Sequence, residues 1–121
     1  MRDTGLLVAM LDEGSAEDII DGNIGIYKGA IYENIIADIF AKSGKKLYYF
    51  EKNSKVEMDF FIRYQKMATA VEVKSAEKAA SKSMTSMIQN YGVMHGIKLT
   101  AGNVAGNETV ESLPLYMAMF L

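Results

Sequence analysis

Two carboxylates and one lysine lie in neighbouring segments that alternate between polar and apolar residues. Asp59 belongs to the segment from Val56 to Arg63, and Glu72 and Lys74 belong to the segment from Ala68 to Lys74. Such alternation predicts two β-strands joined into a hairpin. Opposed carboxylates repel each other unless a cation compensates them, and oxygen ligands favour Mg²⁺ or Mn²⁺. The pattern therefore predicts that Asp59 and Glu72 bind a metal ion, with Lys74 beside it to activate water for attack on phosphorus.

The register of this hairpin decides whether the three side chains meet. A symmetric turn centred between Gln65 and Lys66 brings the apolar residues of both strands onto one face. A four-residue loop from Tyr64 to Met67 would give the same register. The predicted pairs are Phe60 with Val71, Met58 with Val73, Asp59 with Glu72, and Glu57 with Lys74.

A second interpretation of the same residues needs no metal. Glu57, Asp59, Glu72 and Lys74 could form an ion network on a solvated face of the sheet. Phe61 shares that face, however, which predicts that the face is covered, and buried carboxylates without partners are costly. The spacing alone leaves both interpretations open.

Other elements follow from the hydrophobic spacing and the turn residues. Helices are predicted at 27–42, ending at Ser43-Gly44, and around 84–91; strands are predicted at 47–51, 56–63, 68–74, 97–100 and 115–120, with a turn at 52–54. The second helix provides a crossover between the third and fourth strands. We therefore expect a single α/β (α+β) domain with layers like those of a three-layer fold, in which helices flank a mixed β-sheet.

The composition excludes several kinds of site. A chain of 121 residues is the size of one domain, and it contains no cysteine, which excludes disulfides, thiolate zinc sites and cysteine nucleophiles. Its one histidine, His95, is expected to be a structural or surface residue. No apolar run approaches the roughly 20 residues needed to span a bilayer, and the N-terminus is not typical of a secretory signal. We expect a cytoplasmic protein without a membrane partner.

The charge is unevenly distributed. The net charge is −2, but residues 1–41 hold two basic and eight acidic side chains, whereas residues 42–82 hold ten basic and five acidic ones. The basic side chains are Lys42, Lys45, Lys46, Lys52, Lys55, Arg63, Lys66, Lys74, Lys78 and Lys82. They either attract a phosphate backbone, which would make DNA a partner, or form a solvated lysine-rich surface.

The arrangement of Asp59 and Glu72-Val73-Lys74 resembles the motif of the PD-(D/E)xK nuclease-like superfamily, with Met58 at the position of the motif's proline. The order of elements is similar to that superfamily's αβββαβ core, because a helix with Glu33 precedes the hairpin and a second helix follows it. The resemblance implies a nuclease-like fold in which Asp59 and Glu72 bind Mg²⁺ or Mn²⁺, Lys74 is the catalytic lysine and Glu33 is the assisting acid.

A second resemblance covers nearly the whole chain. Its motifs are Asp3-Thr4-Gly5-Leu6-Leu7, Gly29-Ala30-Ile31-Tyr32-Glu33-Asn34, Tyr48-Tyr49, Glu57-Met58-Asp59-Phe60, Val71-Glu72-Val73-Lys74-Ser75 and Leu113-Pro114-Leu115-Tyr116. Together they resemble the uncharacterised C-terminal domain of a prokaryotic family of AAA-type ATPases. The resemblance implies that residues 1–24 connect to an ATPase part and that residues 25–121 form the nuclease-like domain. The phosphate-binding motif G-x-x-x-x-G-K-S/T is absent from the sequence, so we expect no bound nucleotide and no ATPase activity.

Two functions remain as hypotheses. The first is a Mg²⁺-dependent nuclease-like domain that hydrolyses DNA as an accessory to the ATPase, with Gln89, Tyr91, Lys45 and Lys46 as candidate substrate contacts. The second is a catalytically silent module that binds nucleic acid or protein, through self-association or an ATPase partner. Fold alone does not decide between them.

Overall fold

A computed structural model describes residues 3–11, 14–23, 25–52, 56–76 and 81–121. The helices are α1 (Thr4–Ala9), α2 (Ser15–Ile20), α3 (Lys28–Lys42) and α4 (Lys82–Asn90), with 3₁₀ helices η1 (Gly25–Tyr27) and η2 (Leu115–Phe120). The strands are β1 (Tyr48–Lys52), β2 (Val56–Tyr64), β3 (Met67–Val73), β4 (His95–Thr100), β5 (Ala105–Gly106) and β6 (Val110–Pro114). The predicted turn at 52–54 falls partly on residues 53–55, which lie outside the described residues.

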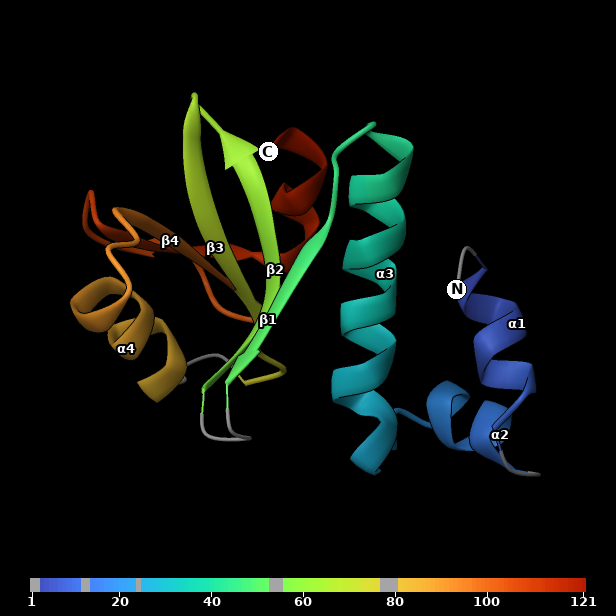
Figure 1. Ribbon diagram of the computed structural model, residues 1–121. Helices are drawn as coiled ribbons and strands as arrows, with labels where there is room; N and C mark the ends of the chain where they lie inside the picture. Colours follow the sequence, from blue (N-terminus) through green and yellow to red (C-terminus); the bar gives the residue numbers. More distant parts are fainter. Residues whose placement is uncertain (1–2, 12–13, 24, 53–55, 77–80) are drawn as a thin grey trace.

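All six strands form one mixed sheet, in the order β1-β2-β3-β4-β6-β5. The first three strands are antiparallel neighbours, whereas β3 pairs with β4 and β4 pairs with β6 in parallel. A parallel pair needs a crossover connection, and α4 lies in the connection between β3 and β4. The predicted mixed sheet flanked by helices, in a single small domain, is confirmed (Figure 1).

Each face of the sheet is covered by a different helix, so the core has two layers (Figure 1). On one face, Ile36 and Phe40 of α3 pack with β-branched and leucine side chains of the central strands and with Ala118 of η2. On the other face, Met84 and Met87 of α4 pack on Met58 and Ala70. The helix approaches β4 so closely that a Cβ atom on Gly96 would overlap the Met84 sulfur.

The α3 helix begins and ends near the predicted residues. Gly44 follows it with a φ of 73°, and the Lys45 N–H donates to the Phe40 carbonyl at 3.0 Å, which closes the C-terminal end. Ile36 and Phe40 face the sheet, whereas Ile35 remains 38% exposed. Among the residues described, no helix combines the length and the apolarity that a bilayer crossing would require.

The hairpin register is confirmed, and its turn has two residues. Phe60 pairs with Val71 and Tyr64 pairs with Met67, so Gln65 and Lys66 form the turn. Both turn residues have positive φ, 48° and 66°, as in the type I′ turn that matches the twist of paired strands. The alternative four-residue loop from Tyr64 to Met67 is wrong, because these two residues are themselves paired. The two-residue turn forms although it contains neither glycine nor asparagine.

The predicted pairing beyond Phe60 is wrong, because β2 contains an irregularity at Asp59. Tyr48 and Phe50 are two steps apart on β1, whereas their partners Phe61 and Met58 are three steps apart on β2. One extra residue on a strand bends it and redirects its side chains. Met58 consequently packs against α4, while Phe60 packs against the α3 layer, although the alternation predicted one face for both.

Two further differences concern the ends of the chain. Residues 115–120, predicted as a strand, form the 3₁₀ helix η2, because Ala118 turns inward against α3 after Pro114 ends β6. The segment 1–24, to which no element was assigned, contains α1 and α2. There the Asn34 side-chain amide on α3 donates to the Thr4 hydroxyl at 3.0 Å.

The hairpin turn generates a stability prediction. An L-residue in the left-handed region costs about 1–2 kcal/mol, and glycine avoids that cost. Lys66→Gly should therefore raise the free energy of unfolding by about 1 kcal/mol in urea denaturation. Lys66→Ala, which keeps the Cβ atom, should bring no comparable gain. A Lys66→Gly protein less stable than the parent would contradict the positive φ at this position.

Candidate functional site

A pocket of about 220 Å³ lies where β2 begins and β3 ends, between the two helices that cover the sheet. Its lining residues are Glu33 of α3, Glu57 and Asp59 of β2, Glu72 and Val73 of β3, Lys74, and Ser83 of α4. The structure thus brings together the four residues predicted for metal binding and catalysis: Glu33, Asp59, Glu72 and Lys74. We call this cavity the acid pocket.

Asp59 is held by a hydrogen bond from the neighbouring strand. Backbone pairing of β2 with β3 extends to Phe60 and Val71, and beyond it the Val73 N–H donates to Asp59 Oδ2 at 2.7 Å. The next amide, Lys74 N–H, donates to the Leu99 carbonyl of β4 at 2.8 Å, on the opposite side of β3. A side-chain carboxylate therefore takes the place of a backbone acceptor where the strands separate, and this separation makes room for the pocket.

Glu72 is the most deeply buried carboxylate of the acid pocket, with 4% of the residue exposed. Its Oε1 atom accepts from Lys74 Nζ at 2.8 Å. Its Oε2 atom is buried and has no hydrogen-bond partner. A buried carboxylate oxygen without a partner is costly. Oε2 is therefore the oxygen of Glu72 that is available to bind a cation.

The surroundings in the pocket raise the pKa of Glu33 and of Asp59. Burial, followed by the charges of Asp59 and Glu57, raises the pKa of Glu33 above its ordinary value, although Lys74 opposes the change. Burial also raises the pKa of Asp59, with Glu72 contributing, against the Val73 N–H bond and Lys74, which lower it. Negative charge is thus in excess here.

Lys74 is the cation that balances this excess. Burial lowers its pKa, but the hydrogen bond and the charge of Glu72, together with Asp59 and Glu33, outweigh burial and raise the pKa of Lys74 above its ordinary value. Lys74 is therefore an ammonium ion at neutral pH. In that form it donates hydrogen bonds and can stabilise negative charge nearby.

The carboxylate oxygens of the acid pocket are chemically suited to bind a hard divalent cation. Carboxylate oxygens are the ligands preferred by Mg²⁺ and Mn²⁺, and Glu72 Oε2 is available to bind one. Within the described ranges, however, no group of three or more aspartate, glutamate or histidine side chains is arranged as a preformed metal centre. Asp59 and Glu72 are the residues that would hold the ion, with water completing its coordination.

Two residues with polar side chains in the pocket, Glu57 and Ser83, were missing from the predicted site. Glu57 was expected only in an ion network, and its Oε1 atom accepts from the Tyr49 hydroxyl at 3.3 Å. Ser83 lies on α4 and reaches the pocket through the packing of that helix on the sheet. The serine carries no sequence signal of its own, since its position depends on how α4 crosses the sheet.

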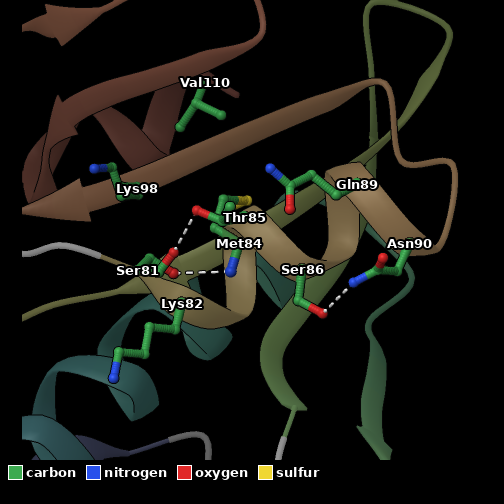
Figure 2. A pocket seen from close by; sticks show the side chains of 9 residues that line it. All are labelled: Ser81, Lys82, Met84, Thr85, Ser86, Gln89, Asn90, Lys98 and Val110. Carbon is green, nitrogen blue, oxygen red and sulfur yellow. Dashed lines mark hydrogen bonds between the residues drawn. The ribbon is translucent and has the colours of Figure 1, made fainter.

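The predicted substrate contacts Gln89 and Tyr91 do not line the acid pocket. Figure 2 shows Gln89 in a separate groove of about 630 Å³ along α4. The groove is lined by Ser81, Lys82, Met84, Thr85, Ser86, Gln89, Asn90, Lys98 and Val110. It adjoins the first turn of α4, from which Ser83 reaches the acid pocket. Tyr91 instead packs edge-on against Phe50, with ring centroids 5.2 Å apart, under the Lys52 ammonium.

Lys45 and Lys46 lie at the other end of β2. With Arg63 they line a pocket beside the hairpin end of the sheet, four residues along β2 from Asp59. At about 3.3 Å per residue, this spacing is roughly 13 Å. These lysines therefore do not contact the acid pocket.

His95, expected to be a structural or surface residue, is buried and takes part in a hydrogen-bonded network. Its Nδ1 atom lies 3.1 Å from the Thr69 hydroxyl, and its Nε2 atom lies 2.9 Å from Glu111 Oε2. The ring stacks on Tyr64 at a centroid distance of 5.9 Å. Both ring nitrogens thus have partners, and none of these residues lines the acid pocket.

The raised pKa of Glu33 generates a testable pH dependence. An acid whose folded-state pKa is raised destabilises the fold at pH values above that pKa, and the cost disappears below the ordinary value of 4.5. Glu33→Gln should therefore raise the melting temperature of the metal-free protein at pH 7 but not in acid below pH 4.5. Glu108→Gln, at an exposed loop position, is the matched control. A gain of the same size at both pH values would contradict the ionic origin.

Comparison with known proteins supplies the family. A family model described as Domain of unknown function (DUF4143) matches residues 28–116, a range that includes every residue of the acid pocket. Neither the curated proteins nor the solved structures gave a match. Because the family model covers most of the chain, this protein belongs to the DUF4143 family, whose domain is found in AAA-ATPase-associated proteins.

Proposed function

We propose that this domain is a Mg²⁺-dependent nuclease-like module that hydrolyses phosphodiester bonds of DNA as an accessory to an AAA-type ATPase. The observation that carries the proposal is the acid pocket itself. Asp59, Glu72, Lys74 and Glu33 come from three separate elements and meet in one cavity, in which Glu72 Oε2 lacks a partner. Buried carboxylate oxygens without a partner are uncommon, and among the described residues Asp38 Oδ1 is the other example, outside the acid pocket.

The roles of the four side chains follow from their contacts. Asp59 and Glu72 would hold the divalent cation, which when bound polarises the phosphate and lowers the pKa of water. Lys74, held as an ammonium by Glu72 at 2.8 Å, orients the attacking water and stabilises the negative charge that develops on the phosphate. Glu33, with its raised pKa, can accept and release a proton beside them.

The groove along α4 supports a polymeric substrate. Both cavities involve the first turn of α4, since Lys82 and Met84 line the groove and Ser83 lines the acid pocket. The lining of the groove combines two lysines with hydroxyl and amide groups and includes no carboxylate. Such groups bind phosphate and sugar oxygens, which favours Gln89 as a substrate contact.

A catalytically silent binding module is the second candidate, and the Lys74–Glu72 ion pair favours it. The ammonium already compensates the charge of Glu72 at 2.8 Å, so part of the pocket is stable without a metal ion. Such a module would bind nucleic acid or protein and cleave nothing.

Metal binding provides the first test. Calorimetric titration of the parent with Mn²⁺ should show saturable uptake, which Asp59→Ala and Glu72→Ala should each abolish while Glu108→Ala retains it. The affinity should fall as the pH is lowered, since protons compete for Asp59, whose pKa is raised. A folded parent that takes up no metal would leave only the silent module.

Cleavage provides the second test. Lys74→Ala should lower the rate of Mg²⁺-dependent DNA cleavage by about 100-fold or more while metal uptake persists. The control is Lys42→Ala, because Lys42 is paired with Asp38 outside the acid pocket. Cleavage that survives Lys74→Ala would exclude this lysine from the chemistry, and cleavage equally reduced in both variants would point to lost charge alone.

A further inference from the structure

A second charged pocket lies beside the hairpin end of the sheet. It has a volume of about 390 Å³ and is lined by Ser43, Gly44, Lys45, Lys46, Tyr48 and Arg63. Three of these six residues are cations and none is acidic. We call it the basic pocket. The residues come from the end of α3, the start of β1 and the end of β2, which lie together at one end of the molecule (Figure 1).

The cations of the basic pocket lack anionic partners. In the parts of the chain that the structure describes, Lys45, Lys46 and Arg63 form no ion pair with a carboxylate. Lys42, only one turn earlier on α3, is by contrast paired with Asp38. Gathering three like charges around a cavity is unfavourable, and a bound anion would offset the repulsion.

A hydrogen bond holds one cation of the basic pocket in place, and an aromatic ring lies at the rim. The Lys45 ammonium donates to the backbone carbonyl of Arg63 at 3.4 Å, which keeps it beside the strand that carries the guanidinium. Tyr48 is 61% exposed at the rim and offers both a ring face and a hydroxyl. Arginine and lysine donors next to an exposed aromatic ring are typical of surfaces that bind nucleic acids.

We propose that the basic pocket binds the phosphate backbone of the nucleic acid whose cleavage is assigned to the acid pocket, and in this respect the inference rests on the proposed function. Arg63 and Asp59 are four residues apart on β2, or roughly 13 Å. Successive phosphates of a DNA strand advance about 3.4 Å along the duplex axis. The basic pocket would thus hold the backbone within a few nucleotides of the acid pocket.

The test measures binding without metal, so its outcome does not depend on cleavage. Fluorescence anisotropy of a labelled short DNA duplex in EDTA should show salt-dependent binding by the parent. Each of Lys45→Ala, Lys46→Ala and Arg63→Ala should reduce the slope of log K against log salt by about 1, for any DNA sequence. The triple variant should reduce the slope by about 3.

Lys42→Ala is the matched control, because it removes a lysine of the same segment that is already paired with Asp38. If Lys42→Ala reduces the slope of log K against log salt as much as Lys45→Ala does, the proposal is overturned. DNA binding would then depend on the net charge of the protein and not on the basic pocket. A folded parent that does not bind DNA, or one that binds polyglutamate as tightly as DNA, would also overturn the proposal. Binding that depends on the basic pocket in a protein that cleaves nothing would support this inference and reject the nuclease.

Discussion

The acid pocket depends on the hydrogen bond between the Val73 N–H and the Asp59 carboxylate. The bond forms where β2 carries one residue more than β1 and backbone pairing with β3 has ended. If the ladder continued in register, Asp59 and Glu72 would be opposed directly on a closed sheet, with no cavity between them. The extra residue instead accompanies a separation of β2 from β3 at this end of the sheet, where the Asp59 side chain still satisfies the freed Val73 amide.

Because the strands separate here, the charged side chains of the acid pocket differ in their burial and in their partners. Glu72 sits deepest and is half satisfied by Lys74, whereas Glu33 approaches from a different layer and is opposed by several negative charges. Burial raises the pKa of both Glu33 and Asp59, and the two acids lie near the ammonium of Lys74. Acids whose pKa is changed by burial and by neighbouring charges are frequent at functional sites, and this agrees with the function proposed for the acid pocket.

The parts that the sequence predicted are those that depend on local patterns. Alternation was sufficient to pair Phe60 with Val71, and Gly44 marked the end of α3, because turn geometry and caps are properties of a few adjacent residues. The position of Met58 on the α4 face could not be predicted from the sequence, because both faces of this sheet are covered and an apolar residue suits either one. Ser83 could not be found from sequence either, because only the docking of α4 brings it to the acid pocket.

The two layers of the core differ in side-chain type, and this difference affects how easily the packing beneath each wall of the acid pocket can rearrange. The α3 layer is built mainly from branched and aromatic side chains, whereas the α4 layer relies on the thioethers of Met58, Met84 and Met87. Unbranched methionine has more rotatable bonds and adapts its shape more easily. The side chains beneath the wall that carries Glu33 therefore have less freedom to rearrange, and those beneath α4 can change their packing more easily.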